Sequence, residues 1–303
     1  MKTAFMFPGQ GVQVVGMGKD FYENYAEAKQ VYENASEILE IDMKKLCFES
    51  SQNDLNKTEN TQIAIAVTSL AILKVIKSLG IKEDFNFGLS LGEYVALIEA
   101  GIISFDDGLT LLRKRGYYMG NFLPKEDFLM LAVIGLESKK IEEICSNIDG
   151  FVVPANYNYS NQTVISGNLE AVKEAENLLK QAGAKKVIPL NTSGPFHTIK
   201  LRKASEMFSK DLDKIEFKEP KNKVIKNLDG TEYTKNDNIK EILAKHIISP
   251  VRFDKILELM KKEHVDRFIE IGPGKALSGF VRKEMDNVEI YSINSIEALK
   301  KLN

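Results

Sequence analysis

The chain of 303 residues is 44% hydrophobic and carries 41 Lys and Arg against 43 Asp and Glu, a formal net charge of −2. A chain of this length and apolar content buries a substantial core, as one large domain or two modest ones, which excludes a disordered protein. The balanced charge gives no general attraction to nucleic acid or to an anionic membrane, so we expect neither as a partner.

The chain has two cysteines, Cys47 and Cys145, and their spacing matches neither a disulfide framework nor a zinc site. We therefore expect reduced thiols, no bound metal and a cytoplasmic protein. The apolar run at 63–73 contains Thr68 and Ser69 and is shorter than the roughly 20 residues that cross a bilayer. The sequence predicts no membrane span, and its first apolar run is too short for a signal peptide.

The first third of the chain alternates between short apolar runs, typical of buried strands, and longer runs whose apolar residues recur about every 3.6 positions. The pattern predicts strands at 3–7 and 85–88 and helices at 25–39, 61–79, 91–100 and 109–120. Alternation of this kind indicates a parallel sheet of the α/β class. Leu123 and Pro124, followed by charged residues, then interrupt the pattern and indicate a domain boundary.

Residues 124–193 are predicted to run strand, helix, strand, strand, helix, strand, which is the split-βαβ order of a ferredoxin-like unit. The larger pattern then resumes, with predicted helices at 199–212, 239–246 and 253–262 and strands at 267–271 and 289–293. We therefore predict a large α/β subdomain formed by residues 1–123 and 194–303. A ferredoxin-like (βαββαβ) small subdomain is inserted into it at 124–193.

The stretch Gly-Leu-Ser-Leu-Gly at 88–92 joins a predicted strand to a predicted helix, which is the placement of a nucleophile elbow. On such a turn Ser90 projects into a cleft, because the small residues two before and two after it let strand and helix approach closely. The backbone N–H of Leu91 and the helix dipole can then stabilise an oxyanion. The alternative interpretation is a serine that only caps the helix.

A serine nucleophile needs a base, and the chain has three histidines, His197, His246 and His264. His264 lies in a charged run typical of a surface, and His246 ends a predicted helix, where a cationic side chain suits the helix C-terminus. His197 follows Gly-Pro-Phe in a loop at the predicted subdomain junction, a common position for catalytic residues. From the residues alone, a structural role for His197 is equally open.

Six motifs together resemble the malonyl-CoA:acyl-carrier-protein transacylase family: FPGQGVQ at 7–13, GLSLGEY at 88–94, RKRGYYM at 113–119, NQTVISG at 161–167, GPFH at 194–197 and EIGPGKALSG at 270–279. The resemblance spans essentially the whole chain. It implies an α/β-hydrolase-like large subdomain with the ferredoxin-like one inserted, and an active site between them. It also implies malonyl transfer from malonyl-CoA to acyl carrier protein for fatty acid biosynthesis, with no cofactor, by a monomer.

The resemblance also implies the catalytic roles. Ser90 is the nucleophile and His197 its general base and acid. The backbone N–H groups of Gln10 and Leu91 form the oxyanion hole, and the backbone carbonyl of His246 orients His197. In these terms a malonyl-serine ester forms and is then passed to the carrier thiol, so ping-pong kinetics are expected.

Specificity is implied to depend on Arg115, which would pair with the free carboxylate of the malonyl group and reject acetyl groups. Arg113 stands two positions away on the same predicted helix, so at most one of the two enters a given cleft. Phe196 either disfavours a methyl branch on the acyl group or only packs in the core. Asn156 and Gln162 either line the channel for the pantetheine arm or occupy turns.

The chain departs from the family pattern at two positions. Leu89 stands where the family motif Gly-His-Ser-Leu-Gly has histidine, and His246 stands where the family usually has glutamine. The first departure leaves open a non-catalytic subunit that docks a carrier protein. A serine esterase or thioesterase is a further alternative, and it would use a histidine near the C-terminus such as His264. An acyltransferase that loads a polyketide carrier protein is the third.

Overall fold

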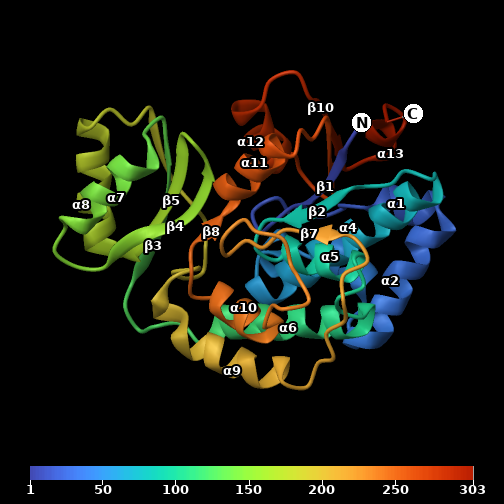
Figure 1. Ribbon diagram of the computed structural model, residues 1–303. Coiled ribbons are helices and arrows are strands. Elements are labelled where there is room, and N and C mark those ends of the chain that lie inside the picture. The colour runs from blue at the N-terminus through green and yellow to red at the C-terminus, as the bar shows by residue number, and fades with distance from the viewer. Residues whose placement is uncertain (303) are drawn as a thin grey trace.

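The computed structural model describes residues 1–302, which form two β-sheets with helices packed around each (Figure 1). The first sheet is entirely parallel, in the strand order β10–β9–β1–β2–β7. Its strands are β1 (Thr3–Phe7), β2 (Phe85–Gly88), β7 (Lys223–Val224), β9 (Arg267–Ile271) and β10 (Glu289–Ile293). The parallel sheet and the helices around it confirm the predicted α/β class.

Strand β1 is central in this sheet and is buried along its whole length. Phe5 and Phe7 point into the hydrophobic core on one face, while Ala4 and Met6 point into the core on the other. Successive side chains of a strand alternate between faces, so a central parallel strand needs a continuous apolar run. The first face is covered by α2 (Ala26–Leu39), α4 (Thr58–Ser78), α5 (Gly92–Glu99) and α6 (Phe105–Asn121), and the second by α11 (Phe253–Lys262) and α12 (Ala276–Glu284).

Helix α4 is the central helix of the first layer and packs against both α2 and α6. By length and composition it could cross a membrane, but 83% of its most apolar 18-residue window is buried inside the fold. A helix that is apolar all round is typical of a protein core as well as of a bilayer. Here the burial assigns α4 to the core.

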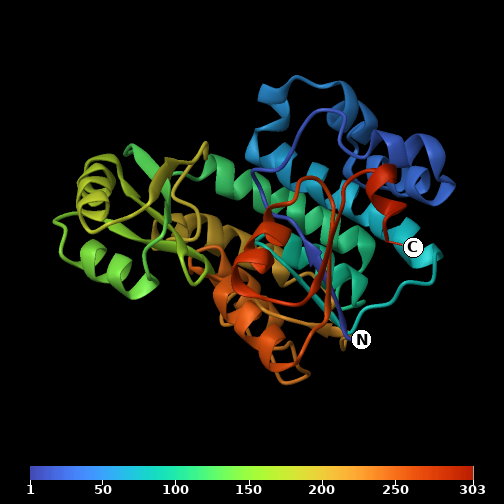
Figure 2. The ribbon, with the colours of Figure 1, turned by 90° about the horizontal axis from the view of Figure 1, so that it is seen from above.

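The second sheet has the order β6–β3–β5–β4–β8 and forms the lobe on the left of Figure 1, which also stands apart in Figure 2. Its strands are β3 (Phe128–Ile134), β4 (Val152–Tyr159), β5 (Gln162–Asn168), β6 (Lys186–Pro189) and β8 (Val251–Arg252). Helices α7 (Ser138–Ser146) and α8 (Leu169–Gln181) pack on this sheet around a separate core that includes Leu131, Ile141 and Val172. The predicted order βαββαβ is observed, and β8 adds a fifth strand from outside the predicted insertion.

Several short elements have no signal in the sequence. They are α1 (Lys19–Asn24), a π-helical turn at Lys45–Glu49, α3 (Gln52–Leu55) and the two-residue strands β7 and β8. The helix predicted at 199–212 begins with a 3-10 turn at Ile199–Leu201. The remaining helices are α9 (Arg202–Leu212), α10 (Ile239–His246) and α13 (Ile296–Leu299). Helix α6 begins four residues before its predicted start at 109, because Ser104 caps it by accepting a hydrogen bond from the Asp107 N–H.

Candidate active site

Ser90 lies on the sharp turn between β2 and α5, with a positive φ of 55°. The turn is possible because both flanking glycines lack a side chain. A Cβ on Gly88 would overlap the backbone of Gly92, and a Cβ on Gly92 would overlap the carbonyl of Phe7. Strand and helix therefore approach as closely as the Gly-x-Ser-x-Gly pattern predicts. Ser90 itself adopts the left-handed conformation, which non-glycine residues rarely adopt.

The Ser90 hydroxyl meets an imidazole from a distant part of the chain. Ser90 Oγ lies 2.8 Å from His197 Nε2, and His197 Nδ1 lies 3.0 Å from the backbone oxygen of His246. A carbonyl oxygen only accepts, so the His197 proton resides on Nδ1 and the Nε2 lone pair faces the serine. This is the tautomer that a general base requires.

The environment of His197 keeps its imidazole neutral. Burial, and then the nearby charge of Arg115, lower the pKa of His197 to about 3, while hydrogen bonds to the backbone of His246 and Ser249 offset only part of this. The ring is therefore neutral at neutral pH, and its Nε2 is free to accept a proton from Ser90. Like Ser90, His197 has a positive φ, here 57°.

Arg115 reaches the same point from α6. Its Nη2 lies 3.0 Å from Ser90 Oγ, its Nη1 donates to Gln62 Oε1 at 2.8 Å, and its side chain is fully buried. The guanidinium also stands over the ring of Tyr94, 5.4 Å from the ring centroid. A buried cation beside the serine, without a carboxylate hydrogen-bonded to it among residues 1–302, suits an anionic substrate group.

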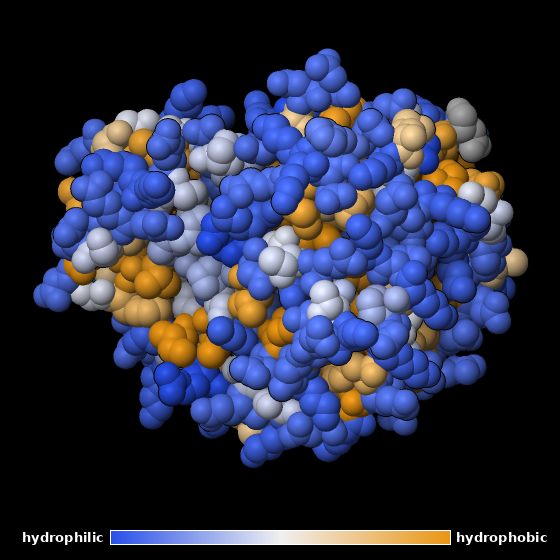
Figure 3. Space-filling model, viewed as in Figure 1, coloured by the Kyte–Doolittle hydropathy of each residue, from blue (hydrophilic) through white to orange (hydrophobic). Residues whose placement is uncertain are grey.

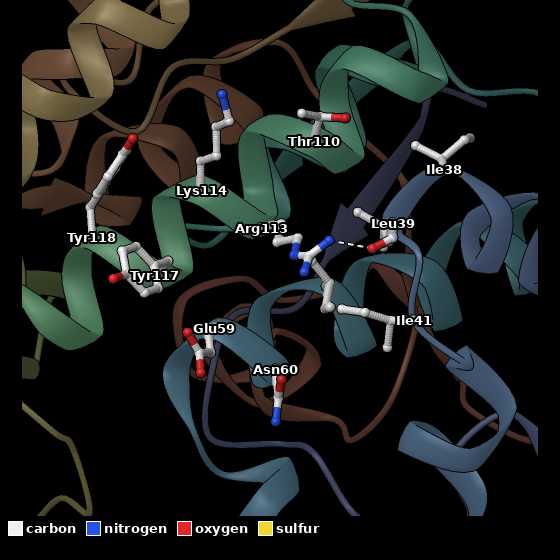
Figure 4. Close-up of a pocket in the computed structure, with 11 residues that line it drawn as sticks. Ile38, Leu39, Ile41, Glu59, Asn60, Thr110, Arg113, Lys114, Tyr117 and Tyr118 are labelled. Carbon is white, nitrogen blue, oxygen red and sulfur yellow. Dashed lines mark hydrogen bonds between the residues drawn. The ribbon is translucent and has the colours of Figure 1, made fainter.

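Arg113 points elsewhere, in agreement with the predicted divergence of the two arginines. It donates to the backbone oxygen of Leu39 and lines a separate surface pocket of about 520 Å³ with Glu59, Lys114 and Tyr117 (Figure 4). That pocket contains none of the predicted catalytic residues. Of the two arginines, only Arg115 reaches Ser90.

A cavity of about 530 Å³ opens in front of Ser90 and His197, between strands of the second sheet and the loops and helices that surround the first. Gln10 and Leu91 lie in its wall, and the backbone N–H groups of both donate no hydrogen bond to protein groups among residues 1–302. These two amides are therefore available to an oxyanion. Figure 3 shows a mostly hydrophilic surface on one face of the molecule, with small apolar patches, several of them near the boundary between the lobe and the main body.

The open alternatives for three further residues concern the same cavity. Phe196 is 6% exposed, belongs to the main core and also lines the cavity, so it packs and faces the substrate space at once. Asn156 and Gln162 lie on β4 and β5 and both line the cavity, which places them in strands and not in turns. Leu89 also contributes to the cavity wall.

Three polar residues behind the site were missed by the sequence analysis. Asn227 is fully buried, accepts from the Ser90 N–H at 2.7 Å and donates to the Gly88 carbonyl at 2.6 Å, so it holds the elbow. Glu93 is buried and accepts from the Tyr233 hydroxyl at 2.7 Å. Glu93 could have been suspected from the sequence, because it lies within the motif GLSLGEY. Asn227 and Tyr233 could not, because they lie more than 130 residues from that motif.

The other two histidines, His246 and His264, differ in burial and in location. His246 is buried beneath His197, whereas His264 follows α11 on the surface, exposed and outside the cavity. His197 is therefore the one histidine within hydrogen-bond distance of Ser90.

Among residues 1–302, no group of three or more His, Cys, Asp or Glu is arranged to hold a metal ion.

The fold and the site together define an α/β protein with a serine–histidine pair on a nucleophile elbow, of the kind that handles acyl groups. The chain belongs to the acyl transferase domain family, whose sequence model matches residues 4–301. It is 39% identical over 302 residues to the malonyl CoA-acyl carrier protein transacylase of Bacillus subtilis, with 99% of this chain and 95% of the relative covered.

Comparison with solved structures supports the same family assignment. The chain is similar to the malonyl CoA-acyl carrier protein transacylase of Clostridium perfringens, with a TM-score of 0.96, 43% identity, and 100% of this chain and 96% of the other covered. A malonyl-transacylase in complex with a type II polyketide acyl-carrier protein has a TM-score of 0.95 and 32% identity, with 99% and 98% covered. Family membership confirms the resemblance drawn from the six motifs.

Proposed function

We propose that this protein transfers the malonyl group of malonyl-CoA to the phosphopantetheine thiol of acyl carrier protein and so supplies fatty acid biosynthesis. One observation carries the proposal: Ser90 Oγ lies within 3.0 Å of both the His197 base and the buried Arg115 cation. A nucleophile with a base suits acyl transfer from a thioester. A fixed cation beside it suits an acyl group that carries its own carboxylate.

In the first half-reaction, Ser90 Oγ attacks the thioester carbonyl and His197 Nε2 takes its proton. The oxyanion accepts hydrogen bonds from the Gln10 and Leu91 N–H groups. The C–S bond then breaks, the CoA sulfur leaves with the proton from His197, and malonyl-Ser90 remains. The His246 carbonyl, which accepts from His197 Nδ1 at 3.0 Å, holds the imidazole in the tautomer that these steps require.

In the second half-reaction, the carrier thiol enters the same cavity. His197 Nε2 takes the thiol proton, the sulfur attacks the malonyl-Ser90 ester, and the C–O bond to Ser90 breaks. Ser90 Oγ recovers the proton from His197, and malonyl-carrier protein leaves. Both half-reactions use the same oxyanion-hole amides, because both pass through a tetrahedral intermediate at the same carbon.

Arg115 links substrate binding to catalysis. In the free enzyme its charge contributes to the low pKa of His197. When the malonyl carboxylate pairs with Arg115, that charge is offset and His197 becomes a stronger base. The substrate with the second carboxylate thereby improves the base that attacks it, whereas an acetyl group does not.

Mass spectrometry of the intact protein tests the proposal. After mixing with malonyl-CoA, we expect wild type to gain one malonyl group, Ser90→Ala to gain none, and addition of holo acyl carrier protein to remove the label with formation of malonyl-carrier protein. A wild-type protein that never acquires the label would contradict the enzyme proposal and favour a docking subunit. Loss of the label to water at the same rate with and without carrier would indicate a thioesterase.

A polyketide carrier is the second candidate acceptor, favoured by the similarity to a transacylase solved with a type II polyketide carrier. Parallel discharge of malonyl-Ser90 by the two kinds of carrier protein ranks them. We further propose a cytoplasmic location, which is supported by two buried, unpaired cysteines and is tested by cell fractionation. The monomeric state rests on the family resemblance and is tested by light scattering.

A further inference from the structure

A buried carboxyl group lies behind the Ser90–His197 pair, and the mechanism above does not use it. Glu93, in the first turn of α5, is 1% exposed. Its Oε1 accepts from the Tyr233 hydroxyl at 2.7 Å, and its Oε2 accepts from the Asn227 N–H at 3.3 Å. Its Oε2 also lies 3.2 Å from His246 Nδ1. A buried carboxyl with so many polar neighbours is held in one orientation.

The His246 ring connects this carboxyl to the catalytic imidazole. The rings of His246 and His197 are stacked, with centroids 5.1 Å apart and planes inclined by 28°. The 3.2 Å approach to Glu93 lacks hydrogen-bond geometry, and neither nitrogen of His246 has a hydrogen-bond partner among residues 1–302. One face of the His246 ring thus lies against His197 while its Nδ1 edge lies against a carboxyl oxygen.

We propose that Glu93 is a positioning residue for His197, acting through the stacked His246 ring so that its carboxylate stabilises the imidazolium formed when Ser90 attacks. This inference rests on the proposed malonyl transfer. In a Ser-His-Asp triad the acid contacts the second ring nitrogen of the histidine. Here the His246 carbonyl accepts the hydrogen bond from that nitrogen of His197. A carboxylate can therefore interact with the His197 imidazole only across the face of the ring. The proton from Ser90 passes through His197 Nε2 to the leaving sulfur and is never transferred to His246 or Glu93.

The charge of Glu93 changes in an accessible pH range, because burial raises its pKa to about 7. The charged or titratable groups facing it from other elements are Tyr233, Arg115, Asp229 and His246. The pKa of His197 is lowered to about 3, and burial also lowers that of His246, so both rings stay neutral from about pH 6 to about pH 9. The hydroxyl of Tyr233 stays protonated there because burial raises its pKa.

The rate of malonyl-Ser90 formation should therefore rise with pH as Glu93 ionises. We would measure the single-turnover rate by rapid quench and intact mass, with malonyl-pantetheine as the donor because it carries no phosphate that titrates near neutral pH. In Glu93→Gln we expect a flat profile at the low-pH level. Its rate at high pH should be about 10-fold to 100-fold below wild type, the size of a Coulomb interaction across one ring at an effective dielectric constant near 20.

Two further variants separate this role from a merely structural one. Tyr233→Phe removes a hydrogen bond that favours the charged carboxylate, so the pKa of Glu93 rises and the rising limb should move to higher pH with its height kept. His246→Gln keeps the carbonyl that accepts from His197 but removes the stacked ring, so the height of the limb should shrink.

These experiments distinguish failure of the inference about Glu93 from failure of the proposed malonyl transfer. If wild type forms no malonyl-Ser90, malonyl transfer itself fails. If wild type forms it but all three variants keep the wild-type profile, or only scale it uniformly, Glu93 has no such role. Should Glu93→Gln fold poorly, the Tyr233→Phe shift still decides, because an unmoved limb in that variant contradicts the inference.

Discussion

Replacing Arg115 by alanine tests where acyl-group specificity originates. Arg115 is fully buried, with one guanidinium nitrogen 3.0 Å from Ser90 Oγ and another 2.8 Å from Gln62 Oε1. Its Nε has no partner among residues 1–302, so the guanidinium has donor capacity left for a substrate carboxylate. Burial lowers the pKa of Arg115, because the buried site gives its charge little solvation before the substrate arrives.

The size of the effect follows from those contacts. A hydrogen bond to a charged group contributes about 1.5–3 kcal/mol, so a two-pronged Arg–carboxylate pair contributes about 3–5 kcal/mol. Since about 1.4 kcal/mol corresponds to a factor of ten, Arg115→Ala should slow malonyl loading by roughly 100-fold to 4,000-fold. Acetyl loading has no carboxylate to lose, and it should stay the same or rise because removal of the cation makes His197 more basic.

Competition between malonyl-CoA and acetyl-CoA measures this change directly, as the ratio of malonyl-Ser90 to acetyl-Ser90 by intact mass. Arg113→Ala is the matched control, because the same side-chain type two positions away lines a different pocket and contacts Leu39. It should leave the ratio unchanged. An unaltered ratio in Arg115→Ala, or an equal loss of both acyl groups, would refute the assignment of Arg115 to the malonyl carboxylate.

Three other predictions concern the base, the elbow and the buried acid. His197→Ala should lose about 100-fold or more of malonyl loading, the usual contribution of a general base, while His264→Ala keeps wild-type rates; loss confined to His264→Ala would instead support an esterase. Asn227→Ala leaves the Ser90 N–H and the Gly88 carbonyl unpaired and should lower the free energy of unfolding in urea by about 2–4 kcal/mol. Burial raises the pKa of Glu93 from 4.5 to about 7. The Glu93 carboxyl therefore makes its full contribution to the free energy of unfolding below pH 4.5, and this contribution is lost as pH rises through about 7. Relative to Glu93→Gln, wild type should therefore lose about 3 kcal/mol over that range, and a pH-independent difference in urea unfolding would contradict this.

Much of the fold and part of the site could be predicted because their signals are local. The buried strand β1 is a continuous apolar run, and the turn at Ser90 requires glycines two residues before and after it, both visible in a few consecutive letters. The six motifs added what no local pattern contains, namely that His197 would meet Ser90 across 107 residues. Spacing alone showed that Arg113 and Arg115 diverge, but only the resemblance indicated which one faces the serine.

The supporting residues could not be predicted, because nothing near them in sequence marks them. Asn227 is an ordinary turn-forming asparagine by its neighbours, yet its side chain bridges Gly88 and the Ser90 N–H across more than 130 residues. The stacking of His246 on His197 likewise depends on how α10 packs beneath the loop at 194–197. Such contacts are created by tertiary packing and leave no period or motif in the chain.

The two residues of the catalytic pair share one backbone property that links the fold to the chemistry. Ser90 and His197 both have positive φ, at 55° and 57°, a conformation that costs a non-glycine residue about 1–3 kcal/mol. Each is held there from behind: Asn227 accepts from the Ser90 N–H, and the His246 carbonyl accepts from the His197 ring. Because these contacts offset the strain, the serine and the imidazole already lie within hydrogen-bond distance before substrate arrives. Residues outside the cavity thus determine the geometry that the residues inside it use.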